Sequence, residues 1–188
     1  METITMITFI SGGARSGKSS FAENMALTIF KKARKTKAYV QLLYIATAKR
    51  SDHEMVQRID RHQNERAKYW KTIEEPHFIS KVLLKANSED VILIDCLTVW
   101  LSNMMFDLDF NVKQFIEAVD EWLRIVRHKG LSLIIVSNDL NEGLPQSNLL
   151  VNDYIFILES LHKRIVNEAD YAVEVITGIP TYWKGEKR

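Results

Sequence analysis

A glycine-rich run near the N-terminus has the residue types and spacing that bind nucleotide phosphates. Residues 12–19 match the pattern G-x-x-x-x-G-K-[ST] between an apolar run and a helical pattern. Glycines let backbone N–H groups approach phosphate oxygens, Lys18 can reach the β- and γ-phosphates, and Ser19 can ligate Mg²⁺. The structural alternative is a glycine-rich turn with a chance lysine. The motif predicts a phosphate-binding loop (P-loop) for a nucleoside triphosphate, formed by Gly12, Gly13, Ala14, Arg15, Ser16, Gly17, Lys18 and Ser19.

Such a site also requires an acidic residue that holds the metal ion or its water. The run Val91-Ile92-Leu93-Ile94-Asp95 is apolar until its last residue, as expected for a buried strand that ends at a site. Ligands of open α/β sheets bind at the carboxyl ends of the strands, so we expect Asp95 beside the P-loop. The alternative is an aspartate that only caps the next turn. We interpret Ser19 and Asp95 as the Mg²⁺ ligands.

His62 is a candidate covalent nucleophile. Residues 52–67 predict a helix after the second strand, and His62 lies on its apolar face. A neutral imidazole near a phosphate can attack phosphorus, while Arg66 and Lys18 can stabilise the developing charge. A histidine on an apolar face can equally be a core residue with no chemical role. The other histidines lack metal-ligand spacing and are expected at the surface or at helix ends: His53, His77, His128 and His162.

Strands that alternate with helices are predicted to position these residues. Apolar runs rich in β-branched residues predict strands at 4–10, 39–46, 91–94, 131–137 and 171–177. Helical patterns occupy 18–32, 52–67, 78–86, 112–129 and 149–168. The alternation predicts an α/β fold of the P-loop NTPase type, with a mostly parallel sheet and helices on both faces. No linker or shift of composition divides the chain, so we expect one catalytic domain over residues 1–188.

Composition excludes several classes of partner. The formal charge is +1, from 25 Lys and Arg against 24 Asp and Glu, which disfavours binding of nucleic acid or an anionic membrane. The apolar runs are far shorter than the roughly 18 residues of a membrane helix, so no membrane insertion is expected. Cys96 is the one cysteine and cannot form an internal disulfide; we expect it to be a small buried residue. These features indicate a soluble cytoplasmic protein whose ligand is a small molecule.

Further short motifs are distributed along nearly the whole chain. Besides the P-loop, they are Tyr44-Ile45-Ala46-Thr47-Ala48, His62-x3-Arg66-x3-Trp70-x-Thr72-x-Glu74, Asp95-Cys96-Leu97-Thr98, Val136-Ser137-Asn138 and Thr177-Gly178-Ile179-Pro180. Together they resemble the adenosylcobinamide kinase / adenosylcobinamide-phosphate guanylyltransferase family.

The resemblance implies a bifunctional enzyme of cobalamin assembly. It would phosphorylate adenosylcobinamide with ATP or GTP, and then transfer GMP from GTP to that phosphate through a guanylyl-His62 intermediate. It also implies a homotrimer that acts on a small corrinoid substrate. The nucleotide contacts implied by the resemblance fall on the P-loop residues and on Ala46, Thr47, Ala48, Gln63, Asn64, Glu65, Arg66, Glu74 and Asp95.

The region between 139 and 163 departs from the family pattern. In the family, the helix of this region usually has a sequence similar to Arg-x-Phe-Arg-Asp, followed by an Asn-Gln pair. Here the helix carries Asn152, Tyr154 and Phe156 instead, and His162-Lys163 stands at the positions of the Asn-Gln pair. Loss of two arginines removes groups that can bind phosphate or carboxylate with two hydrogen bonds. Two alternatives therefore stay open. One is a P-loop kinase for another small alcohol, and the other is a nucleotide-binding protein that has lost one or both activities.

Overall fold

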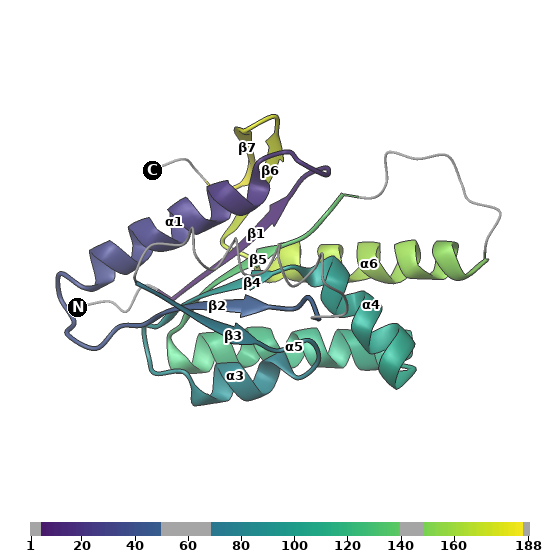
Figure 1. Ribbon diagram of the computed structural model, residues 1–188, viewed down its shortest axis with the longest axis horizontal. Helices are drawn as coiled ribbons and strands as arrows, with labels where there is room; N and C mark the ends of the chain where they lie inside the picture. Colours follow the sequence, from purple (N-terminus) through teal and green to yellow (C-terminus); the bar gives the residue numbers. More distant parts are fainter. Residues whose placement is uncertain (1–4, 50–68, 140–148, 186–188) are drawn as a thin grey trace.

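A seven-stranded sheet forms the centre of the computed structural model (Figure 1), which describes residues 5–49, 69–139 and 149–185. The strand order is β3-β2-β4-β5-β1-β6-β7, and every neighbouring pair is parallel except the β6–β7 hairpin. The strands are β1 Met6–Ser11, β2 Leu42–Ala46, β3 Trp70–Glu74, β4 Val91–Asp95, β5 Ser132–Val136, β6 Tyr171–Ile176 and β7 Ile179–Lys184.

Helices cover both faces of this sheet (Figure 1). They are α1 Lys18–Ala33, α3 Ile79–Lys85, α4 Leu97–Leu108, α5 Val112–Lys129 and α6 Leu149–Glu168. Ala22, Ala26 and Phe30 of α1 pack into the core on one face, whereas α3, α4, α5 and α6 share the core on the other face. The predicted fold class, a mostly parallel sheet with helices on both faces, is therefore confirmed.

The α5 helix shows how local sequence sets an element. Asn111 and Gln114 form a reciprocal capping box at its start, and Gly130 ends it with a left-handed φ of 70°. Its apolar face is buried against α3, α6 and the sheet, and the ring of Trp122 packs edge-on against that of Trp100 of α4, with 4.4 Å between centroids. The predicted bounds 112–129 are confirmed.

Three elements were not predicted from the sequence. β3 is an edge strand with the polar residues Lys71, Thr72 and Glu74, so it lacks the continuous apolar run of a buried strand. α4 begins directly after β4, and its N-cap, Cys96, makes no side-chain capping bond. β7 is the opposite edge strand and contains Pro180, a residue that argues against a strand except at an edge. The helix predicted over 52–67 lies outside the described residues.

No helix among the described residues is both long enough and apolar enough to span a bilayer.

Candidate functional site

The P-loop follows β1 at the carboxyl edge of the sheet and leads directly into α1. Gly17 has a left-handed φ of 88° and is the N-cap of α1, with no side chain over the helix end. Backbone N–H groups at such an end attract anions. Lys18 is buried, and its Nζ donates to the carbonyl oxygen of Gly13 at 2.9 Å. The lysine is therefore held across the loop that it would serve.

Close packing against two neighbouring segments fixes the shape of this loop. A Cβ on Gly12 would lie 2.4 Å from the carbonyl oxygen of Val175, so only glycine fits there. The N–H of Gly178, at the β6–β7 turn, donates to the Ser16 carbonyl at 2.7 Å, and the N–H of Asp139 donates to the Gly12 carbonyl at 3.0 Å. The loop is thus held from the hairpin on one side and from the end of β5 on the other.

Strand register brings Asp95 to the same edge. Ile10, just before the loop, pairs with Val136 of β5, and Val136 pairs with Asp95 of β4. Residues alternate between the faces of a strand, and Leu93 packs into the core under α1, so Asp95 is directed to the face where α1 begins. The structure therefore brings Asp95 and the P-loop to one edge, separated by a single strand.

The same register continues outward to β2 and β3. Asp95 pairs with Ala46, and Ala46 pairs with Glu74. Trp70 packs into the core under α1, and Thr72 and Glu74 follow it at two-residue steps on that face. The Trp-x-Thr-x-Glu spacing therefore reflects every second residue of the edge strand β3, all on one face of the sheet. Glu74 is exposed at the end of this row, four strands from β1.

Thr47 joins the ends of β2 and β4. It is fully buried, and its Oγ1 accepts from the N–H of Cys96 at 2.8 Å and donates to the Cys96 carbonyl at 2.9 Å. Asn103 of α4 donates to the Thr47 carbonyl. These bonds give Thr47 a structural part next to the site, while Ala48, half-buried, follows it toward the surface. The predicted nucleotide contacts of Ala46, Thr47 and Ala48 stay predictions.

Cys96 is buried, as predicted. Burial raises the pKa of its thiol, the neighbouring carboxylate of Asp95 raises it further, and Sγ lies 2.9 Å from Thr98 Oγ1. A thiol with a raised pKa carries little thiolate and is a poor nucleophile.

Tyr44 of β2 was quoted in a motif but given no part by the sequence. Its hydroxyl donates to Asp95 Oδ2 at 2.6 Å, which makes it a direct neighbour of the proposed metal ligand. No spacing rule indicates this contact, because the two residues are 51 positions apart and meet only through the pairing of β2 with β4.

The prediction that His162 lies at the surface is wrong. Its Nε2 forms a 2.7 Å hydrogen bond with Ser137 Oγ at the end of β5, and its ring packs 4.9 Å, centroid to centroid, from Phe9. The histidine faces the sheet because α6 packs this side of the helix on β1, the strand that carries Phe9. His128, in contrast, is exposed in the last turn of α5, and His77 lies at a helix end, two residues before the start of α3, as predicted. His53 lies outside the described residues.

Acidification should destabilise the protein through His162. Burial lowers the pKa of its imidazole from 6.5 to about 4, against the opposing effect of Asp139. The unfolded chain binds a proton below pH 6.5 and the folded chain only near pH 4, so stability is lost over that window, by on the order of 3 kcal/mol. We expect His162→Gln, which can still bond Ser137, to remove this part of the pH dependence.

Urea unfolding at pH 7 and pH 4.5 measures the effect. His128→Gln removes an exposed imidazole from a helix end and is the control, which should keep the pH dependence of the wild type. If His162→Gln and the wild type lose equal stability between the two pH values, the buried imidazole is not the cause.

The residues predicted to act around His62 are not placed by the structure. His62, Gln63, Asn64, Glu65 and Arg66 lie outside the described residues. The described chain before them ends at Lys49, which pairs with Asp107 of α4, and Asp107 Oδ2 also lies 2.6 Å from His77 Nε2. The described chain before them therefore ends just past the carboxyl end of β2, the strand that pairs with the strand of Asp95.

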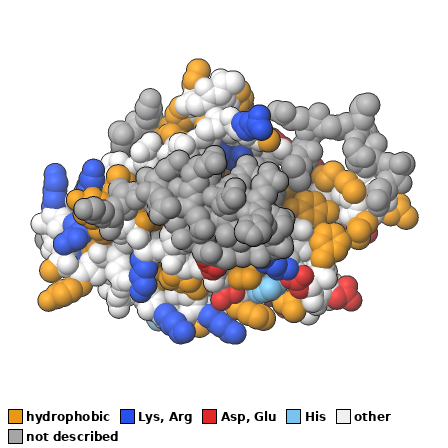
Figure 2. All heavy atoms as spheres, viewed as in Figure 1, with side chains coloured by type: hydrophobic (Ala, Val, Ile, Leu, Met, Phe, Trp, Pro, Cys, Tyr) orange, Lys and Arg blue, Asp and Glu red, His pale blue; other side chains and the backbone are white. Residues whose placement is uncertain are grey.

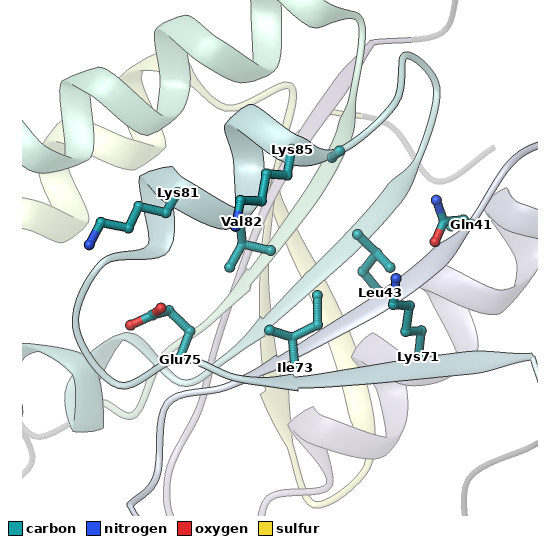
Figure 3. A pocket seen from close by; sticks show the side chains of 9 residues that line it. Gln41, Leu43, Lys71, Ile73, Glu75, Lys81, Val82 and Lys85 are labelled. Carbon is teal, nitrogen blue, oxygen red and sulfur yellow. The ribbon is translucent and has the colours of Figure 1, made fainter.

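A cavity of about 330 Å³ lies elsewhere, between β2, β3 and α3 (Figure 3). Its lining includes Leu43, Ile73 and Val82, with Lys71 and Lys85 at its sides. Leu43 and Val82 belong to the core on the face opposite α1. None of the described residues that were predicted to bind the nucleotide lines this cavity; those of the P-loop and Asp95 lie at the carboxyl edge of the sheet instead.

The donors at the P-loop edge suit Mg²⁺. A serine hydroxyl and a carboxylate are hard oxygen ligands, and Mg²⁺ is commonly held by one or two such groups together with nucleotide phosphates. Ser19, half-buried in the first turn of α1, and Asp95 are the residues that would hold the ion. The edge thus brings together a buried cationic side chain, Lys18, and two oxygen donors, Ser19 and Asp95, the residue types that the predicted triphosphate site requires.

A family model described as cobinamide kinase / cobinamide phosphate guanyltransferase matches residues 8–182. Among curated proteins, the bifunctional adenosylcobalamin biosynthesis protein CobP of Pseudomonas aeruginosa is 32% identical over 183 residues, with 94% of this chain and 96% of that protein covered. The corresponding CobU protein of Salmonella typhimurium is 27% identical over 186 residues, with 93% and 97% covered.

Two solved structures share the fold. The flagellar accessory protein FlaH from Methanocaldococcus jannaschii has a TM-score of 0.53 at 15% identity, covering 97% of this chain and 79% of that one. A second solved structure, an ATPase domain, has a TM-score of 0.51 at 10% identity, covering 90% of this chain and 69% of that one. At these identities the likeness concerns the fold alone.

Proposed function

Because this chain belongs to the cobinamide kinase / cobinamide phosphate guanyltransferase family, we propose that it catalyses both reactions of that family at the P-loop edge of the sheet. The observation that carries the proposal is the strand pairing of β1 with β5 and of β5 with β4, which brings Asp95 to the edge of the sheet where the P-loop leads into α1. Its substrates are adenosylcobinamide, a corrinoid, and a nucleoside triphosphate, ATP or GTP.

In the kinase reaction, the hydroxyl oxygen of the aminopropanol arm attacks the γ-phosphorus of ATP or GTP. A new P–O bond forms, the bond between the γ-phosphorus and the bridging oxygen breaks, the nucleoside diphosphate leaves, and the hydroxyl proton is released to solvent. Lys18 exchanges its bond to Gly13 for the β- and γ-phosphates, where its charge stabilises the transition state. Mg²⁺, when held by Ser19 and Asp95, neutralises phosphate charge.

In the guanylyl transfer, an imidazole nitrogen of His62 attacks the α-phosphorus of GTP and pyrophosphate leaves. A phosphate oxygen of adenosylcobinamide phosphate then attacks the same phosphorus, the P–N bond breaks, and the imidazole is restored. Arg66 stabilises the charge on the phosphoryl oxygens, and Gln63, Asn64, Glu65 and Glu74 contact the nucleotide. The support for these roles is the sequence motif and the family to which the chain belongs.

The departures between 139 and 163 affect this proposal unequally. His162 bonds Ser137 beneath the sheet, and the Tyr154 hydroxyl donates to the Thr98 carbonyl at 2.6 Å. His162 and Tyr154 therefore attach α6 to the end of β5 and to α4, respectively. Asn152 and Phe156 are exposed, so of these replacements they are the ones that could change contacts with a substrate or with another subunit.

The protein is proposed to act in the cytoplasm as a homo-oligomer, with a trimer as the family-based expectation. Support comes from hydrophobic side chains that gather over α4 and α6 (Figure 2), since exposed apolar patches commonly mark protein interfaces. The exposed members are Phe106, Leu108, Leu149, Leu150 and Phe156. Light scattering of the purified protein tests this, and a monomer contradicts it.

Isotope transfer tests the two activities separately. With Mg²⁺ and adenosylcobinamide, label from γ-labelled ATP should enter the corrinoid. With α-labelled GTP, label should first enter the protein and then move to adenosylcobinamide phosphate. A kinase for another alcohol would label no corrinoid but would label a different alcohol from γ-labelled ATP. A protein that has lost catalysis would bind nucleotide and transfer neither label.

A further inference from the structure

Tyr44 directs its hydroxyl at Asp95 from the neighbouring strand. The side chain is only 5% exposed, and its hydroxyl donates to Asp95 Oδ2 at 2.6 Å. A phenol O–H can donate, while a carboxylate oxygen accepts. The direction of this hydrogen bond is therefore set by the chemistry of the two groups.

Strand pairing enforces the contact. Ala46 pairs with Asp95 and Tyr44 pairs with Leu93, so Tyr44 lies diagonally across from Asp95 on the same face. Diagonal neighbours on paired strands are within reach of a long aromatic side chain. The ring of Trp70 on β3 packs edge-on against the tyrosine, with 5.8 Å between centroids and 81° between planes. The Tyr44 ring is thus fixed by packing against Trp70, and its hydroxyl is hydrogen-bonded to the Asp95 carboxylate.

We propose that Tyr44 is a positioning residue for Asp95 in the binding of Mg²⁺ with the nucleotide. Its hydrogen bond occupies Oδ2 and leaves Oδ1 to serve the metal or a metal-bound water. Groups that orient a metal ligand in this way commonly change metal affinity about 10- to 100-fold when removed. The inference rests on the proposed function, because it assigns Tyr44 to the metal-dependent half of that site.

The decisive variant is Tyr44→Phe, which keeps the ring against Trp70 and removes only the hydroxyl. Binding of a fluorescent GTP analogue is titrated with Mg²⁺, and binding in EDTA is measured alongside. We expect the Mg²⁺ concentration for half-maximal binding to rise about 10-fold, with binding in EDTA unchanged. A purely structural tie between β2 and β4 predicts instead a lower melting temperature with the same Mg²⁺ midpoint.

Two further variants make the test specific. Tyr182→Phe removes a hydroxyl from a tyrosine packed on the same core, on β7, and should leave the Mg²⁺ midpoint unchanged. In an Asp95→Asn background, Tyr44→Phe should add no further shift, since the carboxylate it orients is gone.

The proposal is overturned if Tyr44→Phe keeps the wild-type Mg²⁺ midpoint, or if it shifts the midpoint equally in the Asp95→Asn background. A wild-type protein that binds GTP without dependence on Mg²⁺ would instead contradict the metal site of the proposed function, and with it this assignment. The two failures are distinguishable, because a wild type that responds to Mg²⁺ keeps the metal site even where Tyr44→Phe leaves the midpoint unchanged.

Discussion

Replacing Lys18 by alanine is expected to lower the rates of both transfer reactions by about 100- to 1000-fold, the usual loss when one charge-stabilising donor is removed. The ammonium group is buried and bonded to the carbonyl of Gly13 across the P-loop, so it is held where the phosphates are proposed to bind. Both reactions should fail together, because one triphosphate site serves both. The measurement is transfer of γ-label from ATP and of α-label from GTP, with GTP affinity measured by calorimetry.

Lys31→Ala is the matched control for this variant. Lys31 lies in the last turn of the same helix and is exposed, so its loss changes the net charge equally but leaves the loop intact. Circular dichroism establishes that both variants are folded. Retention of either reaction at wild-type rate in folded Lys18→Ala would show that this reaction does not use the P-loop.

The His62→Ala variant should lose all covalent label from α-labelled GTP and all guanylyl transfer. Its rate of phosphorylation of adenosylcobinamide should stay within a few-fold of the wild type, since the attack on the γ-phosphorus uses the substrate hydroxyl and not the imidazole. In the wild type, a P–N bond to histidine predicts label that is lost in acid and kept in alkali. Denaturing electrophoresis after each treatment measures this.

His128→Ala provides the control, because that histidine is exposed in the last turn of α5 and its loss should leave the labelling unchanged. Label that persists in His62→Ala would assign the nucleophile to another residue. Loss of both reactions would indicate that His62 supports nucleotide binding in general. These outcomes decide whether the alternative interpretation of His62 as a core histidine holds.

Elements with a strong local signal were predicted well, and elements without one were not. The α5 helix has a capping box, a periodic apolar face and a terminal glycine, all within its own 20 residues or so. β3 and β7 are edge strands. In β3 polar residues interrupt the apolar ones, and β7 contains a proline. Their strand character comes from hydrogen bonds to a neighbour, which no local pattern records.

The amino-acid sequence by itself contained the P-loop motif and was sufficient to predict that Asp95 lies at the same edge of the sheet. Both are short-range patterns: a fixed spacing of glycines and lysine, and an apolar run that ends in a carboxylate. Their shared position follows from a general property of parallel sheets, whose strands all end at one edge.

Only the tertiary structure decided which side chains support that edge. Tyr44 reaches Asp95 across 51 residues, His162 reaches Ser137 across 25, and Thr47 bonds Cys96 across 49. Each contact depends on strand order and register, which are set by burial of the whole sheet between α1 and the helices of the other face. Because that packing is a cooperative property of distant segments, the residues that position the site cannot be identified from spacing along the chain.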